Sequence, residues 1–529
     1  FLKQKKDHPR HLVSRDAKPY FSDNGEKLFF GLAPMPFLPD TMLLPEETVK
    51  LDIWSWTDGR IMTEQINKLD DEKKRSFAAV YRIPEQKLVA LASEEVPEVR
   101  FSSTKNSDFA VGFSEEKYLK QSGWEGAAYR DFYLIDLKTG DKSLIVNKIR
   151  GNPVVSPEGG FISWFSEADS AWFAYDIKNT TTHKLTNNRT VAFYNEEDDT
   201  PDFPAAWGMA GWLAGDAGLI VYDKYDIWRL DPTGAKTPEL LTEGRENRMI
   251  FRKIRLDLEE KSLNPVVNWL VHRKSERDKT EGYSFYNINK WHFALYSLFP
   301  DLAVSKNPIK ARRGKAMISS FESFGQFPDI EYFWDWQDID QHKTISEANP
   351  QQKNYWWGSA ELVHWPGEGG REMTGMLFMP DDFRPDRQYP MIVNFYERSS
   401  DGLFEHRAPA PGRSQINYTY YTSRGYLVFN PDIPYEIGRP GESALKTVVG
   451  GTEFLIQKGF VDKGRIGLQG HSWGGYQVAY IISRSTMFAC AEAGAAVVNM
   501  TSAYGGIRWE SGLSRVFQYE HQQSRIGGT

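Results

Sequence analysis

The sequence has little cysteine and no long apolar run. Cys490 is the only cysteine among 529 residues, so no disulfide can form within the chain. It lies in an apolar stretch, where we expect a small buried thiol. No apolar run approaches the ~18 residues that a membrane-spanning helix needs, so no membrane span is predicted. The sequence shows no signal peptide, but it begins at Phe1 rather than Met, so this absence says little about location.

Motifs for metals and cofactors are also missing. There is no His-Glu-x-x-His pattern, no glycine-rich phosphate loop and no dinucleotide-binding fingerprint, so we expect neither a metal nor a cofactor. The formal net charge of −7 argues against a nucleic-acid partner. The length exceeds that of one ordinary domain, and 40% hydrophobic with 26% charged residues fits a globular protein. We therefore expect two globular domains.

A repeated pattern of short β-rich runs extends over residues 1–345. One half of it is an apolar run closed by an Asp-x-x-x-Gly-like turn, at residues 54–59, 134–140, 175–180 and 228–234. The other half is a Ser-x-x-Gly-like turn before a strand, at 22–25 and 156–159. The spacing fits four-stranded propeller blades, which recur at about 40–50 residues. We predict a β-propeller of about seven or eight blades, whose N-terminal part need not be complete. An irregular β-sandwich is the alternative.

The pattern changes after Gln341. A polar linker at 345–353 precedes a predicted hairpin of two strands, at 360–365 and 373–379. Predicted strands at 390–396, 426–430, 465–469 and 491–498 then alternate with helices at 443–458 and 474–484. This alternation is typical of a mostly parallel sheet covered on both faces. We predict a propeller over 1–345 and an α/β-hydrolase domain over 346–529.

The motif Gly-x-Ser-x-Gly stands at residues 470–474, between an apolar strand and a predicted helix. In this context the serine lies on a sharp strand-to-helix turn that exposes its Oγ, and the flanking glycines avoid collisions with neighbouring elements. Ser472 is thus the predicted nucleophile, and the backbone N–H of Trp473 is the predicted oxyanion donor. The alternative is a glycine-rich turn with an inert serine.

Three segments carry a family resemblance. Residues 459–476, which contain Gly-His-Ser-Trp-Gly-Gly-Tyr, resemble the nucleophile region of the prolyl oligopeptidase family, which includes dipeptidyl-peptidases and acylaminoacyl-peptidases. Residues 387–396 resemble that family's strand ending in an oxyanion tyrosine, and 424–432 its next strand and aspartate. The resemblance implies a serine peptidase that hydrolyses oligopeptides through an acyl-enzyme, with a propeller gating access. It assigns Tyr396 as a phenolic oxyanion donor; a half-buried tyrosine at a strand end is the alternative.

A base and a carboxylate for Ser472 are not evident. In α/β-hydrolases the chain order is serine, then Asp or Glu, then His. The resemblance places both later members well beyond the nucleophile, on loops after further strands. His521 is the one later histidine, and no matching Asp-containing strand precedes it, while His471 is expected to be a motif residue of the turn. We expect the Asp and His beyond Thr529, in a further segment or a second chain, and the chain alone to be inactive.

The resemblance also suggests where substrate binds. It implies Val497, Met500 and Tyr504 as pocket walls, followed by Trp509, although core packing explains Val497 equally well. The acidic run at 196–199 lies late in the predicted propeller, so we expect a solvated loop rather than the carboxylate pair that grips a free amine in dipeptidyl-peptidases. We expect peptides as partners, and a homodimer is possible. By family analogy we expect a periplasmic or secreted location, with the cytoplasm as the alternative.

Two functions from other classes remain. An esterase-type hydrolase would use the same nucleophile turn on ester substrates, but a propeller is not needed for it. A catalytically silent scaffold would use the propeller as a binding platform and would explain the missing base, but not the intact Gly-x-Ser-x-Gly turn.

Overall fold

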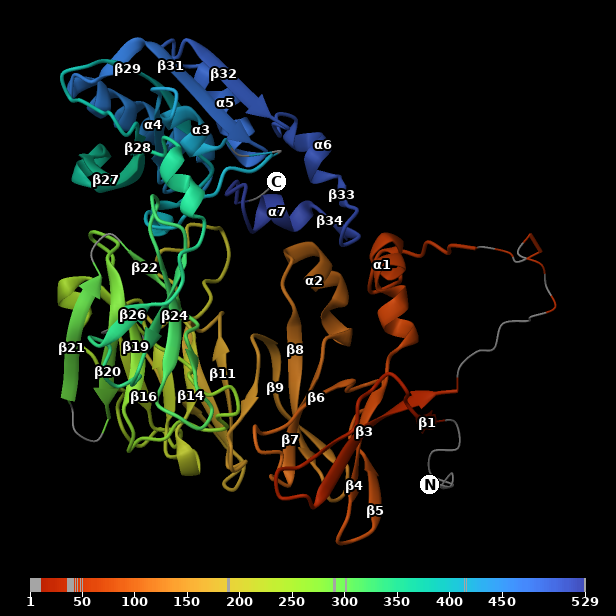
Figure 1. The fold of residues 1–529 in the computed structure, drawn as a ribbon. Coiled ribbons are helices and arrows are strands. Elements are labelled where there is room, and N and C mark those ends of the chain that lie inside the picture. The colour runs from red at the N-terminus through yellow and green to blue at the C-terminus, as the bar shows by residue number, and fades with distance from the viewer. Residues whose placement is uncertain are drawn as a thin grey trace.

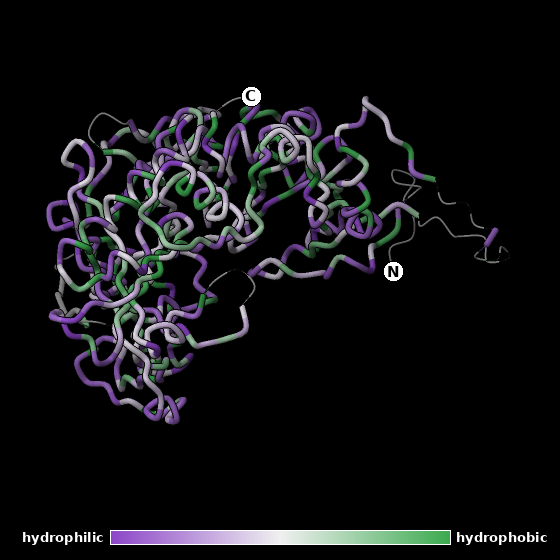
Figure 2. Tube along the Cα trace, turned by 90° about the horizontal axis from the view of Figure 1, so that it is seen from above, coloured by the Kyte–Doolittle hydropathy of each residue, from purple (hydrophilic) through white to green (hydrophobic). Residues whose placement is uncertain are grey.

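The computed structural model describes residues 11–35, 42, 44, 46–47, 49, 51–187, 191–288, 292–299, 302–412, 414 and 416–527. Six antiparallel sheets lie in the first part of the chain, and a single mixed sheet with helices lies above them (Figure 1). Seen from above in Figure 2, hydrophilic segments dominate the outer turns, and hydrophobic segments run inside. In the described ranges, no helix combines the length and the apolar character that crossing a membrane requires.

The six sheets follow one another along the chain. The first contains β1 (His11–Val13), β2 (Tyr20–Phe21), β3 (Lys27–Pro34), β4 (Phe77–Arg82) and β5 (Lys87–Ala90); the second contains β6 (Glu98–Arg100), β7 (Phe109–Ser114), β8 (Tyr129–Asp136) and β9 (Lys142–Arg150). The third contains β10 (Val154–Val155), β11 (Phe161–Ser166), β12 (Ala171–Asp176) and β13 (Thr181–Lys184); the fourth contains β14 (Met209–Trp212), β15 (Leu219–Tyr222), β16 (Ile227–Leu230) and β17 (Glu239–Leu240). The fifth contains β18 (Met249–Lys253), β19 (Trp269–Ser275), β20 (Glu281–Asn287) and β21 (His292–Phe299); the sixth contains β22 (Ala303–Val304), β23 (Ile309–Lys310), β24 (Met317–Glu322), β25 (Asp329–Phe333) and β26 (His342–Thr344).

Consecutive sheets pack face to face through separate apolar clusters. Val80 and Ile135 belong to the cluster between the first two sheets, and Trp164 belongs to the next. A series of small sheets in which each packs on the next is the arrangement of a β-propeller. The fold class predicted from the sequence is therefore confirmed, and the β-sandwich alternative is not. The described residues form six such sheets, and the predicted total of about seven or eight was for a propeller whose N-terminal part need not be complete here.

Most of the predicted turns close hairpins. The turns at 134–140, 175–180 and 228–234 follow β8, β12 and β16, and those at 22–25 and 156–159 precede β3 and β11. The first predicted copy, at 54–59, is not a strand: Trp56 is 88% exposed, and β3 pairs instead with β4, which comes after it. An apolar run forms a strand only where a neighbouring strand can take its backbone hydrogen bonds.

Two helices that the sequence did not predict interrupt the β-rich part. They are α1 (Met62–Lys73) and α2 (Leu119–Glu125), with a 3-10 turn at Glu116–Tyr118. Both lie against the C-terminal segment of the chain (Figure 1). The Thr63 hydroxyl donates to the Gly512 carbonyl at 2.5 Å, and the Trp124 indole donates to Glu520 at 2.7 Å. These contacts join the propeller to the other domain far from the linker.

The second part is an α/β-hydrolase sheet with the strand order β27-β28-β30-β29-β31-β32. Its strands are β27 (Ser359–Pro366), β28 (Glu372–Met379), β29 (Tyr389–Asn394), β30 (Leu427–Pro431), β31 (Val461–His471) and β32 (Cys490–Gly494). Its main helices are α3 (Tyr418–Thr422), α4 (Pro440–Gln457) and α5 (Trp473–Ile482), followed by α6 (Met500–Tyr504), β33 (Ile507–Arg508), β34 (Leu513–Ser514) and α7 (Val516–Glu520). β27 and β28 form the predicted hairpin, and β30, β29, β31 and β32 are parallel.

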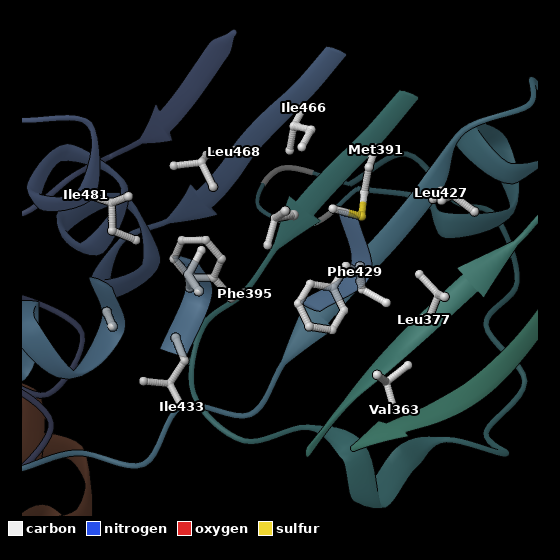
Figure 3. Close-up of a cluster of buried hydrophobic side chains, with 14 of the residues drawn as sticks. Val363, Leu377, Met391, Phe395, Leu427, Phe429, Ile433, Ile466, Leu468 and Ile481 are labelled. Carbon is white, nitrogen blue, oxygen red and sulfur yellow. The ribbon is translucent and has the colours of Figure 1, made fainter. Parts of the chain in front are cut away.

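The core of this domain lies under the central strands. Met391, Phe429 and Leu468 come from β29, β30 and β31 and are at most 2% exposed. Figure 3 shows these side chains together with Phe395, which directly follows β29, and Ile481 from α5. Such continuous apolar strands are what a sheet buried on both faces requires. The packing fixes the ends of β29 and β31, where the predicted site residues lie.

The environment of Cys490 differs from the prediction. Cys490 is exposed, and the strand that it begins is shorter than the predicted 491–498. Within the described residues β32 pairs only with β31, so it stands at the edge of this part of the sheet. An apolar sequence alone does not say whether a strand is central or at an edge, and an edge strand has one side without a neighbour.

Candidate active site

Ser472 stands on the sharp turn between β31 and α5, as the motif predicts. Its backbone has φ 55° and ψ −110°, a conformation that a residue with a side chain rarely adopts. The Ser472 N–H donates to the Gly494 carbonyl at 2.7 Å, and the Tyr476 N–H donates to the Ser472 carbonyl at 3.0 Å. These two bonds hold the strained residue in place, so the serine is presented at the carboxyl ends of the parallel strands.

The neighbouring glycines are required by close backbone approach. A Cβ at Gly470 would lie 2.6 Å from the backbone of Gly474. One at Gly474 would lie 2.7 Å from the Phe395 carbonyl, and one at Gly475 would lie 2.7 Å from the Gly494 carbonyl. Backbone cannot move aside as a flexible side chain can, so any larger residue would displace the turn.

Trp473 is the first residue of α5. Its N–H is one of the first amides of the helix, which have no acceptor within the helix and carry the positive end of the helix dipole. The indole is 3% exposed and stacks on Tyr476 with ring centroids 4.7 Å apart. The buried ring anchors the start of the helix beside Ser472, a position suited to stabilising negative charge.

Tyr396 follows β29 and is fixed at both its backbone and its phenol. Its carbonyl accepts from the Tyr435 hydroxyl and from Gln477 Nε2, each at 2.9 Å. Its phenol oxygen accepts from Gln523 Nε2 at 2.6 Å. Burial raises the pKa of Tyr435, so that hydroxyl stays a neutral donor. Since the Tyr396 oxygen is already an acceptor, its own O–H proton is available to a further acceptor.

Ser472 and Tyr396 line one pocket of about 480 Å³ at the ends of β29, β30 and β31. The remaining lining residues are mainly polar: Asn394, Phe395, Glu397, Arg398, Ser399, Arg407, Ser414, Tyr418, Asn430 and His471. A serine and a phenol in one cavity, beside a helix N-terminus, form an arrangement that can hold an acyl group and its oxyanion.

Asp432 holds the turn that contributes Ser399 to this pocket. Its carboxylate accepts from the Ser399 and Ser400 amides at 2.7 and 3.0 Å and from the Thr374 hydroxyl at 3.0 Å. The turn that follows Tyr396 is therefore tied to the end of β30. This contact places Arg398 toward the propeller.

The acidic run at 196–199 is not a solvated loop throughout, contrary to the prediction. Asp199 lies between the two domains, where its carboxylate accepts from Arg525 at 2.8 Å and from Arg398 at 3.3 Å. It also accepts from the Tyr435 N–H at 3.0 Å. A charge run is normally solvated, but here the cations come from positions distant in sequence, and the sequence pattern could not show them.

Arg525 links the same region to the segment that contacts Tyr396. Its guanidinium donates to Glu397 at 2.9 Å and lies over the Tyr435 ring, 4.2 Å from the centroid. It also donates to the Gln523 carbonyl at 2.9 Å. No sequence motif marked Arg525, Gln523, Tyr435 or Gln477, because their roles depend on contacts between segments that no fixed spacing relates.

The predicted pocket walls lie elsewhere. Val497, Met500 and Tyr504 are not among the residues that line the Ser472 pocket. Met500 packs at the edge of the hydrolase core, and the Tyr504 hydroxyl donates to Glu520 at 2.5 Å. Trp509 is 74% exposed. Their assignment to substrate stays a prediction.

The two histidines near the motif also differ in position. His471 ends β31 and lines the pocket with Ser472. His521 follows α7, lies 3.8 Å from the Glu520 carboxylate and is not among the residues that line this pocket. His521 therefore does not face Ser472 across this pocket.

Residues 437–522 match the model of the prolyl oligopeptidase family. This segment contains α4, the nucleophile turn and α5. The chain is 28% identical to mouse dipeptidyl peptidase 8 over 153 residues, which is 26% of this chain and 17% of that protein. It is 23% identical over 159 residues to an Arabidopsis thaliana protein named "Probable glutamyl endopeptidase, chloroplastic", covering 27% of this chain and 16% of that protein. The aligned part thus spans under a fifth of each relative.

Solved structures share the architecture over nearly the whole chain. A prolyl endopeptidase structure superposes with a TM-score of 0.52 at 11% identity, covering 97% of this chain and 68% of that one. This likeness establishes the fold: a propeller followed by an α/β-hydrolase domain.

Proposed function

We propose that this chain, which carries a prolyl oligopeptidase family domain, is a serine peptidase that hydrolyses oligopeptides through an acyl-enzyme on Ser472. The observation that carries the proposal is the strained Ser472 turn, whose pocket also contains Tyr396. The Ser472 oxygen attacks the peptide carbonyl, and the Trp473 N–H and the Tyr396 phenol stabilise the oxyanion. Collapse of this intermediate releases the amine and leaves the acyl group on Ser472, which water then removes.

The reaction needs a base that takes the Ser472 proton and returns it to the leaving amine. Chain order in α/β-hydrolases places a carboxylate and then a histidine after the nucleophile. We infer that this carboxylate and this histidine lie outside residues 1–529, in a later segment or a second chain. Tyr396 and the helix amide supply oxyanion stabilisation independently of that base.

The propeller favours a peptidase over an esterase. It is joined to the hydrolase domain by the ion pair of buried Arg525 with half-buried Asp199 and by the contacts of α1 and α2. A propeller fixed beside the pocket would restrict access to short or unfolded chains. The names of the two curated relatives differ in cleavage type, so they do not decide the preferred residue for this chain.

The test is labelling of the intact protein with a fluorophosphonate probe, followed by peptide mapping. We expect the label on Ser472 and its loss in Ser472→Ala. Ser423→Ala is the matched control, because Ser423 is partly exposed and is not among the residues that line the Ser472 pocket. An intact protein that folds but takes no label would contradict the proposal and favour the silent scaffold.

A further inference from the structure

Arg407 is the charged group of the Ser472 pocket with the fewest compensating contacts. Among the described residues, its buried Nε has no hydrogen-bond partner. Within the same part of the chain, its Nη2 makes a long bond of 3.4 Å to the Gly402 carbonyl. Glu405 also lies beside Gly402, but within the described ranges no carboxylate comes within 4.0 Å of the Arg407 guanidinium.

The other charges of the pocket are already paired. Glu397 accepts from Arg525 at 2.9 Å, and Arg398 donates to Asp199 at 3.3 Å. These pairs are internal to the protein and leave little net charge to offer a ligand. Arg407 therefore supplies a positive charge without a carboxylate partner, among the described residues, to the pocket that Ser472 also lines.

Two aromatic rings beside Arg407 hold its guanidinium in a defined orientation. Its guanidinium lies 5.2 Å from the Tyr418 ring centroid and 6.0 Å from that of Phe378. Tyr418 is 8% exposed, and its hydroxyl is fixed by Asn394 and Asn430 at 2.9 Å each. An arginine held against aromatic rings keeps a defined orientation and binds carboxylates well through its planar fork of donors. Leaving a half-buried cation without a counter-ion is unfavourable, and a ligand carboxylate would remove that cost.

We propose that Arg407 is a specificity-determining residue that binds the carboxylate of an acidic side chain, Glu or Asp, in the peptide segment next to the cleaved bond. This inference rests on the proposed peptidase function and names its substrate class. Arg407 acts on binding and orientation, whereas the bond-breaking groups are Ser472, Trp473 and Tyr396.

The experiment uses the intact enzyme and internally quenched peptides that differ only by Glu or Gln at each position flanking the cleaved bond. We expect kcat/KM to favour Glu by about 10- to 100-fold at one position, the range for a charge-assisted hydrogen bond. Arg407→Gln should bring that ratio close to one, and Arg407→Lys should keep part of it. Arg407→Glu should favour Lys at the same position instead.

Arg424→Gln is the matched control. Arg424 also lies over a tyrosine, 3.6 Å from the Tyr420 ring centroid, but it lines a different surface. Its variant should keep the Glu-to-Gln ratio.

Fluorophosphonate labelling of each variant reports whether the active site is intact. A labelled enzyme without a Glu preference, or one that keeps it in Arg407→Gln, would overturn the proposal for Arg407 alone. An intact wild-type protein that takes no label would overturn the peptidase function as well.

Discussion

Gln523 donates a hydrogen bond of 2.6 Å to the Tyr396 phenol, although 127 positions separate the two residues. The Gln523 amide is oriented by Gln518, whose Nε2 donates to its Oε1 at 3.1 Å. The amide nitrogen therefore faces the phenol, and the phenol proton is left for another acceptor. The Tyr396 phenol, the proposed oxyanion donor, is in this way positioned by residues 518–523 as well as by its own strand.

This contact predicts coupled kinetic effects. Tyr396→Phe should lower kcat by about 10²–10³-fold, the usual effect of losing one oxyanion donor. Gln523→Ala should lower kcat about 10-fold with little change in KM, because only the orientation of the phenol is lost. In the double variant the two losses should not add. Gln337→Ala, at an exposed position, is the control, and fully additive losses would show that Gln523 does not act through Tyr396.

The nucleophile turn predicts a steric effect at Gly474. Gly474→Ala should prevent fluorophosphonate labelling, because the new Cβ would lie 2.7 Å from the Phe395 carbonyl. Gly505→Ala is the matched control, since a Cβ there meets no atom within 4 Å. Labelling rate and thermal unfolding measure both variants. Normal labelling of Gly474→Ala would mean that this backbone contact does not constrain the turn.

The contact between the domains predicts a stability effect at Arg525. Its side chain is 7% exposed and pairs with Asp199 and Glu397 at 2.8 and 2.9 Å. Arg525→Met should destabilise the protein by about 3 kcal/mol, because Glu397 loses its cation while Asp199 keeps only Arg398 and the Tyr435 N–H. The exposed pair Arg312–Glu259 at 3.1 Å is the control, and Arg312→Met should cost less than about 1 kcal/mol. Equal shifts in thermal unfolding would contradict the interdomain role.

Glu281, in the fifth propeller sheet, should make the stability of the protein depend on pH. Burial would raise the pKa of Glu281, but the hydrogen bond to His272 and the charge of Lys274 outweigh it and lower the pKa to about 2 from an ordinary 4.5. A folded-state pKa below the unfolded one gives stability that is present above about pH 4.5 and is lost as pH falls toward 2. This difference corresponds to about 3 kcal/mol.

Denaturant unfolding of wild type and Glu281→Gln at pH 7 and pH 3 tests this. The variant should be less stable than wild type at pH 7, and the gap should narrow at pH 3. Glu259→Gln, at a site 71% exposed, is the control and should leave the pH profile unchanged. A constant gap between wild type and Glu281→Gln would show that the Glu281 carboxylate is not the titrating group.

Elements with local causes could be predicted from the sequence. The Gly-x-Ser-x-Gly turn, the hairpin of β27 and β28, and most blade turns follow from residues close together in the chain, because a strained turn or a tight hairpin restricts which residues fit. Because their motifs are local, Ser472 could be predicted as the nucleophile, and Trp473 and Tyr396 as oxyanion donors, from the sequence.

Which distant groups meet depends on the packing of the folded chain. The exposure of Cys490, the position of Asp199 between two arginines, and the contact of Gln523 with Tyr396 depend on how separate segments pack. The lack of a carboxylate beside Arg407 among the described residues is equally invisible in the sequence, because an arginine's partners lie wherever the fold places a carboxylate. Hydrogen bonds and ion pairs act over a few ångströms, and the fold, not the spacing along the chain, sets those distances.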